Sequence, residues 1–288
     1  MGIKINRLEG CIGAEVEGVD ITGPIDAQTY LQLQDALDEH IVLVFHDQDI
    51  TDAQQVIFSE RFGPLEMSLP SDPFGGGGPV FNIANVDADG QIRPAEDPLT
   101  LYQSGNLLWH SDGSFREVPL QTSFLSAKVI PPEGGETEFS SLRAAYAALP
   151  SEKKVLLEGL VAEHSMAHSR ARIAPNLLSK SFQDEVPPVR HLLVRTISAT
   201  GEKVHFVGSY ASHVIGWPFE KGRDLLQELL QWSTQPQFVY RHQWRVNDLV
   251  MWDNRLSLHR GRPWDVGKYK RIMHRTTLAG EGSTVPQD

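Results

Sequence analysis

The chain contains 288 residues, and its 37 Asp and Glu outnumber its 26 Lys and Arg, which gives a formal net charge of −11. This balance argues against nucleic acid or an anionic membrane as the main partner, because both are bound through an excess of basic side chains. The only cysteine, Cys11, excludes an internal disulfide and a Cys-based zinc site, so a metal would need His, Asp or Glu ligands. With no signal-like N-terminus and no apolar run of about 18 residues, we expect a cytoplasmic protein without membrane spans.

The first part of the chain predicts two helices and a buried strand. Apolar side chains recur at helical spacing over residues 26–40, and the apolar run at 41–45 suits a buried strand. Thr51 and Gln54 have the spacing of a capping box, which predicts a second helix that Gly63 and the following proline end.

Residues 66–105 are rich in Gly, Pro, Asp and Asn, and they predict a lid-like loop region with one short strand near 80–83. Four successive glycines at 75–78 resemble a phosphate-binding loop at first sight. No Gly-Lys-Ser/Thr follows them and no helix begins there, so the run favours a flexible loop over a nucleotide site.

Predicted strands dominate the rest of the chain, and they cover residues 107–109, 121–130, 192–197, 204–207, 238–244, 249–252 and 271–278. Helices are predicted at 141–149, 151–160 and 220–232. Because the strands bear the polar motifs and the helices lie at the start and in insertions, we predict a mainly β protein with added helices (α+β). A β-sandwich or jelly-roll core fits this pattern better than an alternating βαβ sheet, and we expect residues 1–288 to form a single domain.

One His-x-Asp motif occurs in the sequence, His110-Ser111-Asp112, and there is no His-x-Glu. In a strand, residues two apart point to the same face, so both side chains could bind one metal without distorting the backbone. The motif alone is also compatible with the end of a surface strand and a turn.

A second candidate ligand, His259, follows an apolar strand and a polar turn in the stretch MWDNRLSLHRGR at 251–262. Two histidines and one carboxylate on one side of a metal form the facial triad, which leaves three positions open and suits non-haem Fe(II) and O₂ chemistry. Taken singly, a histidine in this setting is more often structural.

Arg271 and Arg275 are four residues apart in a predicted strand and therefore share a face. Guanidinium groups pair bidentately with carboxylates, so the two arginines favour anion binding beside the metal. A basic outer strand paired with acids elsewhere is the alternative for this segment alone. Residues 255–275 contain seven Lys and Arg and one acid, Asp265, so positive charge is concentrated here in an otherwise acidic chain.

Together these residues resemble the Fe(II)/2-oxoglutarate-dependent dioxygenases of the taurine and 2,4-dichlorophenoxyacetate dioxygenase family. The phenoxyacetate (aryloxyalkanoate) branch is the most similar, from residue 238 to residue 262. The matching stretches run in order along nearly the whole chain: IVLVF at 41–45, RFGPL at 61–65, WHSD at 109–112, GGETEF at 134–139, WDNR at 252–255, HRGR at 259–262 and RIMHR at 271–275.

This resemblance implies a double-stranded β-helix core of the jelly-roll, cupin-like type. It implies that His110, Asp112 and His259 bind Fe(II), and that 2-oxoglutarate chelates the iron. The far carboxylate of 2-oxoglutarate would then pair with Arg271 and accept a hydrogen bond from Thr137. O₂ would be consumed, and succinate and CO₂ released, as the substrate is hydroxylated.

The resemblance further implies that Arg275 holds an acidic group of the primary substrate. Asn106 lies just before the metal-binding stretch, so we expect it to contact the substrate, with a packing role as the alternative. Phenoxyacetate-degrading relatives are thought to place additional basic side chains before the His-x-Asp motif, whereas residues 66–91 contain no Lys or Arg. The expected substrate is therefore a small organic anion such as an aryloxyalkanoate, with or without ether or C–heteroatom cleavage. A taurine-like alkylsulfonate is the alternative.

Two other classes fit parts of the pattern. A zinc hydrolase could use the same triad but needs no second anion clamp, and a non-catalytic jelly-roll binding protein has no reason to keep the triad together with both arginines. His164 and His168 have the spacing of helical zinc ligands, but Ser165 stands where a zinc protease needs Glu. The resemblance also implies a homo-oligomer of unspecified number.

Overall fold

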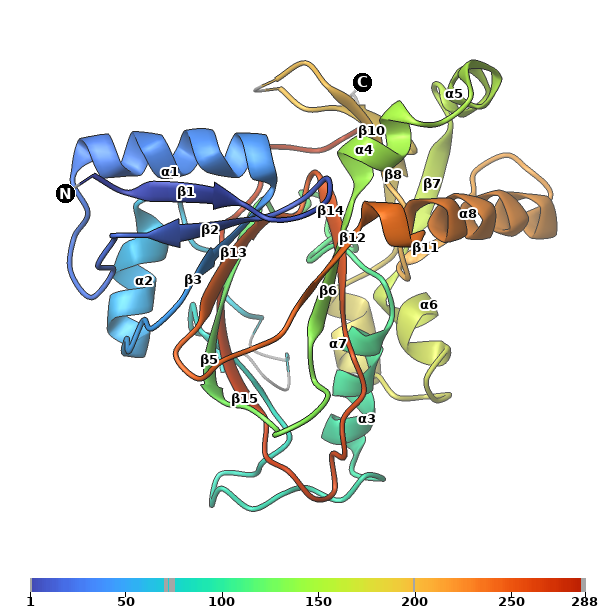
Figure 1. The fold of residues 1–288 in the computed structure, drawn as a ribbon. Helices are drawn as coiled ribbons and strands as arrows, with labels where there is room; N and C mark the ends of the chain where they lie inside the picture. The colour runs from blue at the N-terminus through green and yellow to red at the C-terminus, as the bar shows by residue number, and fades with distance from the viewer. Residues whose placement is uncertain (1, 70–71, 73–75, 199, 286–288) are drawn as a thin grey trace.

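The computed structural model describes residues 2–69, 72, 76–198 and 200–285, and this part of the chain is a mixed α+β structure (Figure 1). Its larger sheet has seven strands in the order β1-β2-β3-β13-β5-β15-β4. These strands are β1 (Lys4–Arg7), β2 (Ala14–Glu17), β3 (Val42–Phe45), β13 (Leu249–Asp253), β5 (Thr122–Val129), β15 (Ile272–Thr277) and β4 (Phe81–Ala84). Neighbouring strands are antiparallel except for the parallel pair β2–β3.

A second, three-stranded sheet with the order β12-β6-β14 lies opposite the larger one (Figure 1). It consists of β12 (Val239–His242), β6 (Thr137–Ser141) and β14 (Ser257–Gly261). Two smaller sheets pair β11 (Ala211–Val214), β7 (Val161–His164) and β8 (Val189–Leu192), and β10 (Lys203–His205) with β9 (Val194–Thr196).

The helices of the described residues lie around these sheets. On the outer face of the larger sheet lie α1 (Ala27–His40) and α2 (Asp52–Glu60) (Figure 1). The others are α3 (Pro98–Ser104), α4 (Leu142–Ala147), α5 (Ser151–Leu157), α6 (Met166–Ala171), α7 (Lys180–Glu185) and α8 (Phe219–Ser233), with short 3₁₀ turns η1 (Gly105–Leu107) and η2 (Pro236–Phe238).

Strand β13 contributes to two cores, because its side chains alternate between the faces of the larger sheet. Met251 packs on the outer face in a cluster that includes Phe58 of α2. Trp252 points the other way and packs on Phe139 of β6, with 5.4 Å between the ring centroids. The two sheets therefore share one inner core, and each fully buried aromatic side chain in it contributes about 1.5–3 kcal/mol.

Most of the predicted elements are confirmed. The structure has helix α1 with Asp26 as its N-cap and strand β3, and Thr51 and Gln54 form both hydrogen bonds of a capping box at α2. The strands predicted at 192–197 and 204–207 form the antiparallel pair β9–β10. Strands β5, β12, β13 and β15 and helices α4, α5 and α8 lie where the sequence predicts them.

Two predictions are wrong. Residues 107–109 are not a strand, since η1 occupies 105–107 and His110 forms an isolated bridge with His259. The segment 66–105 is not all loop, because α3 lies inside it; Asp97 caps the backbone N–H groups of the next turn and Pro98 takes the first helical position. Part of the glycine run at 75–78 lies outside the described residues.

Of the helices in the described part of the chain, none combines the length and apolar character that a membrane span requires.

Candidate metal centre and adjoining cavities

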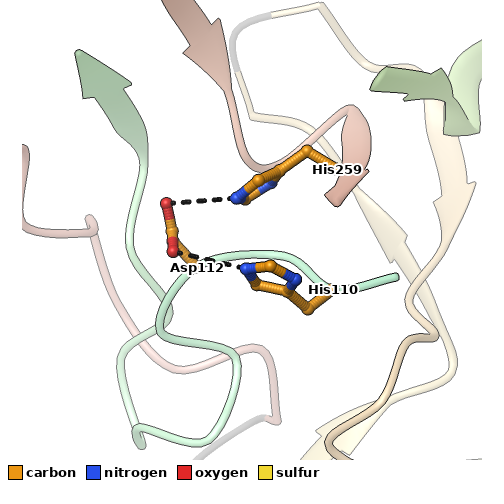
Figure 2. A group of neighbouring side chains, drawn as sticks. All are labelled: His110, Asp112 and His259. Carbon is orange, nitrogen blue, oxygen red and sulfur yellow. Dashed lines mark ion pairs between the residues drawn. The ribbon is translucent and has the colours of Figure 1, made fainter. Parts of the chain in front are cut away.

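The three predicted metal ligands come together in the structure (Figure 2). One ligand atom from each of His110, Asp112 and His259 lies within 4.8 Å of the others. His110 Nε2 is 3.9 Å from Asp112 Oδ1, and His259 Nε2 is 3.6 Å from Asp112 Oδ2. All three are buried, with exposed fractions of 3%, 4% and 6% in chain order. A buried set of two imidazoles and one carboxylate at this spacing fits a metal ion.

The local backbone explains how distant segments meet here. The His110 N–H donates to the His259 carbonyl at 3.0 Å, and the His259 N–H donates to the His110 carbonyl at 2.8 Å. His259 belongs to β14, whereas Asp112 lies in the turn that follows His110. The convergence therefore depends on backbone pairing between two chain segments, and the alternation within one strand that the sequence suggests is absent.

The protonation states of these groups suit metal binding. Burial lowers the pKa of His110, and burial together with the neighbouring His110 lowers that of His259 well below its usual range. His110 Nδ1 lies 2.7 Å from the Leu108 carbonyl and must donate to it, so Nε2 keeps its lone pair toward the site. Burial opposes the charge of Asp112, but Arg275 and the two imidazoles outweigh it and bring the pKa of this carboxyl to about 2.

Both oxygens of Asp112 have partners. Arg275 Nη1 donates to Oδ1 at 2.5 Å, and the Ser123 hydroxyl donates to Oδ2 at 2.8 Å. Asn254, which is fully buried, accepts from the Asp112 backbone N–H at 3.1 Å and donates to the Ser123 oxygen at 2.9 Å. The Asn254 amide oxygen also accepts from the Trp252 indole at 2.9 Å, which fixes the orientation of the amide. The carboxylate is therefore held in one orientation from both sides.

A cavity of about 310 Å³ opens beside His110 and His259, and Arg271 lies in its wall. The Arg271 side chain is buried, and its Nε donates to the Gly135 carbonyl at 3.1 Å. Burial lowers its pKa to about 10, so the guanidinium remains charged at neutral pH. Among the described residues no carboxylate forms an ion pair with it. The cavity thus contains a buried cation that lacks a protein counter-ion.

Thr137 lines the same cavity from β6. Its hydroxyl oxygen accepts a hydrogen bond from the Trp244 indole at 3.0 Å. Because an indole N–H can only donate, the Thr137 hydroxyl keeps its own proton for an acceptor in the cavity. Arg271 and Thr137 therefore both offer donors to an anion.

The remaining two predicted residues lie where a second, smaller cavity of about 70 Å³ adjoins the first. Asn106 and Arg275 line both cavities, together with Ile83 and Gln103. Arg275 is the partner of Asp112, and its guanidinium carbon lies 5.1 Å from the centroid of the Phe81 ring. The structure therefore places all seven predicted site residues around the metal centre or its cavities.

Several residues that shape the site were not predicted from the sequence. Asn85 accepts from the Arg271 backbone N–H at 2.8 Å and donates to the carbonyls of Val266 and Tyr269. Trp244 orients Thr137, and Ser123 holds Asp112. Asn254 stands in the WDNR stretch, so a motif marks its position, but its role depends on partners far away in the sequence.

Residues 4–277 match the family described as the taurine catabolism dioxygenase TauD, TfdA family. The chain is 41% identical over 282 residues to the alpha-ketoglutarate-dependent 2,4-dichlorophenoxyacetate dioxygenase of Cupriavidus pinatubonensis, which covers 96% of this chain and 98% of that protein. It is 35% identical over 286 residues to the (S)-phenoxypropionate/alpha-ketoglutarate-dioxygenase of Sphingobium herbicidovorans, and the match covers 96% of this chain and 95% of that protein. A solved structure described as AAD-2 in complex with Mn(II) and N-oxalylglycine matches with a TM-score of 0.92 and 39% identity, over 100% of each chain.

Proposed function

The chain belongs to the taurine catabolism dioxygenase TauD, TfdA family, and from this membership we propose that it is a non-haem iron, 2-oxoglutarate-dependent dioxygenase of aryloxyalkanoates. The enzyme uses Fe(II), 2-oxoglutarate and O₂ to hydroxylate a small anionic substrate, and releases succinate and CO₂. The observation that carries the proposal is the buried cluster of His110, Asp112 and His259 beside a cavity whose buried Arg271 forms no ion pair with any carboxylate of the described residues.

We assign Fe(II) to His110, Asp112 and His259. Their ligand atoms lie close together, the imidazoles favour the neutral form and the carboxyl is ionised, so little protonation energy opposes metal binding. Bound Fe(II) supplies the activation of O₂, which no side chain can provide. The protein's own contribution is to bind, orient and shield the reactants.

We assign the far carboxylate of 2-oxoglutarate to Arg271 and Thr137. A buried guanidinium without a protein counter-ion favours a bidentate carboxylate, and the Thr137 hydroxyl lies in the same cavity wall with a proton to donate. The contact of Arg271 with the Gly135 carbonyl and that of its backbone with Asn85 fix the direction of the side chain.

The primary substrate belongs where the two cavities meet, beside Arg275 and Asn106. The larger cavity also has apolar side chains in its wall, among them Leu101, Leu107 and Val266, which suit an aryl ring. The names of the similar proteins favour aryloxyalkanoates over alkylsulfonates as the substrate class.

We further propose that the two facing sheets form a double-stranded β-helix of the jelly-roll type and that residues 1–288 are one domain. Segment 66–105 acts as a lid, because four residues of α3 line the larger cavity. We also expect a cytoplasmic homo-oligomer, and size-exclusion chromatography with light scattering tests the oligomeric part of that expectation.

Succinate formation tests the function. We expect it with aryloxyacetates or 2-aryloxypropionates when Fe(II), 2-oxoglutarate and O₂ are all present, and we expect His110→Ala to abolish it. An anaerobic titration with Fe(II) and 2-oxoglutarate should give a weak visible charge-transfer band. Turnover that persists in His110→Ala would contradict the assignment of the iron site. Hydrolysis that depends on zinc would favour the hydrolase. A kcat/KM that is higher for taurine than for the aryloxyalkanoates would favour the alkylsulfonate class.

A further inference from the structure

The smaller cavity contains a cation that the proposed function does not use. Its wall includes Asp112 and Arg275 of the metal centre, and Arg170 of α6 completes it from the opposite side, next to Tyr210. Tyr210 also touches the metal centre, since its ring lies edge-on to that of His110, with 6.1 Å between centroids. A group bound beside Arg170 would therefore lie close to the proposed iron ligands.

The Arg170 side chain is deeply placed and firmly packed, with only 4% of the residue exposed. Its guanidinium carbon lies 4.7 Å from the Tyr102 ring centroid and 5.8 Å from that of Tyr210. Gly105 permits this position, because a Cβ there would lie 2.4 Å from Arg170 Nη1. The guanidinium is therefore held in place before any ligand arrives.

No ion pair of Arg170 with a carboxylate is found among the residues that the structure describes. Burial opposes the charge, but the phenols of Tyr210 and Tyr102 outweigh it and raise the pKa of Arg170. Its Nε has no hydrogen-bond partner, and among the described residues no carboxylate lies within ion-pair distance of it.

The other arginines of this cavity are neutralised by protein carboxylates. Arg275 pairs with Asp112 at 2.5 Å, and Arg116 pairs with Glu66 at 2.6 Å. A buried and charged guanidinium that no carboxylate offsets favours an anionic ligand.

We propose that Arg170 is the anion anchor for the primary substrate, and that it binds the carboxylate of an aryloxyalkanoate. This inference rests on the proposed function and extends it. The carboxylate would occupy the smaller cavity, and the aryl ring would extend past Asn106 into the larger, apolar one. The carbon next to the carboxylate is then the part of the substrate nearest the metal ligands.

This assignment also explains how the chain manages without basic residues at 66–91. The anchor comes from α6, on the far side of the cavity from β15, instead of from the loop that precedes the His-x-Asp motif. Arg275 would be shared, since it already contacts Asp112 and can offer its other nitrogens at the junction of the cavities.

The test compares an aryloxyalkanoate with its uncharged primary amide. In Arg170→Gln we expect the KM of the acid to rise by about tenfold or more, with the KM of the amide within about threefold of wild type. Arg172→Gln is the matched control, because Arg172 follows the same helix, is exposed and does not line this cavity. Substrate-induced changes in the anaerobic Fe(II)–2-oxoglutarate band provide a second readout, of binding alone.

An equal rise in both KM values would show that Arg170 only supports Tyr102 and Tyr210, and would overturn the proposal. Should Arg170→Gln fail to fold, wild-type enzyme decides, since equal binding of acid and amide leaves nothing for an anion anchor to explain. A normal band in Arg170→Gln keeps the proposed function intact whatever happens to the acid. Loss of the band in the wild type would instead overturn the function and the anchor with it.

Discussion

The carboxylate of Asp112 shows how much of this centre depends on residues that touch no reactant. Asn254 and Ser123 bind one another and hold the Asp112 backbone N–H and Oδ2. Mutation of a residue that hydrogen-bonds a metal ligand typically lowers metal affinity by about 10–100-fold. We therefore expect Asn254→Ala to weaken Mn(II) or Fe(II) binding by about tenfold or more, measured by calorimetry on folded protein.

Ser257→Ala is the control for this prediction, because this buried hydroxyl donates to the Asp253 carbonyl and does not contact Asp112. Equal losses of metal affinity in both variants would contradict the prediction.

Arg271 gives a second prediction for a single residue. Lysine keeps the charge but lacks the planar fork that binds a carboxylate bidentately. In Arg271→Lys we expect the KM for 2-oxoglutarate to rise by about tenfold, while metal affinity without 2-oxoglutarate stays at the wild-type value. An unchanged KM would place the cosubstrate elsewhere.

The three proposed ligands could be predicted from the sequence because His110, Asp112 and His259 stand in short motifs whose chemistry needs those residue types. Asn254 and Arg170 could not, since their roles arise from burial and from partners far away along the chain. In a sequence, an arginine is taken as a surface charge by default, because only the structure shows that its guanidinium is buried without a neighbouring carboxylate.

At the scale of elements, the successes follow local physics. Capping residues and helical periodicity predict α1 and α2, and apolar runs predict β3 and β13. Strand β6, with the sequence TEFSS, carries no such signal. Neighbouring strands β12 and β14 pair with its backbone, and its Phe139 packs on Trp252 of the larger sheet, so its burial has a tertiary cause.

The capping box of α2 permits a stability prediction separate from catalysis. Thr51→Ala removes the side-chain acceptor for the Gln54 N–H, which should lower the free energy of unfolding by about 1 kcal/mol. Thr51→Ser keeps the acceptor and should retain most of the stability in urea denaturation. Succinate formation at moderate temperature should be the same in both variants, because α2 lies on the outer face of the larger sheet. A catalytic loss confined to Thr51→Ala would show that α2 is coupled to the site.

At the scale of the whole molecule, the histidines predict a weakness toward acid. The pKa is lowered, first of all by burial, at His110, His164, His168, His191, His205, His242 and His259. Free histidine titrates near pH 6.5, so below that pH the unfolded chain binds protons that the folded chain refuses. Stability should therefore fall as the pH drops from about 7 toward the folded values, which are about 4 for His191 and about 3 for His205.

Thermal unfolding of the metal-free protein between pH 7.5 and 5 measures this effect. His205 is fully buried, so it contributes up to about 1.4 kcal/mol per pH unit, and His205→Gln should reduce the slope of unfolding free energy against pH by that amount. A slope that stays the same in the variant would mean that His205 takes up its proton in the folded state.

The reciprocal hydrogen bonds between the backbones of His110 and His259 have a consequence for biosynthesis. A nascent chain that has emerged from the ribosome only as far as β6 carries two of the three proposed iron ligands, His110 and Asp112, and lacks β14, whose His259 pairs with His110. If these residues bind Fe(II) as proposed, such a chain lacks one ligand and the backbone pairing that brings the ligands together, so we expect it to bind iron weakly until β14 has emerged. We therefore expect iron to bind only after the C-terminal strands have been synthesised, because the order of the strands along the chain places the last ligand late.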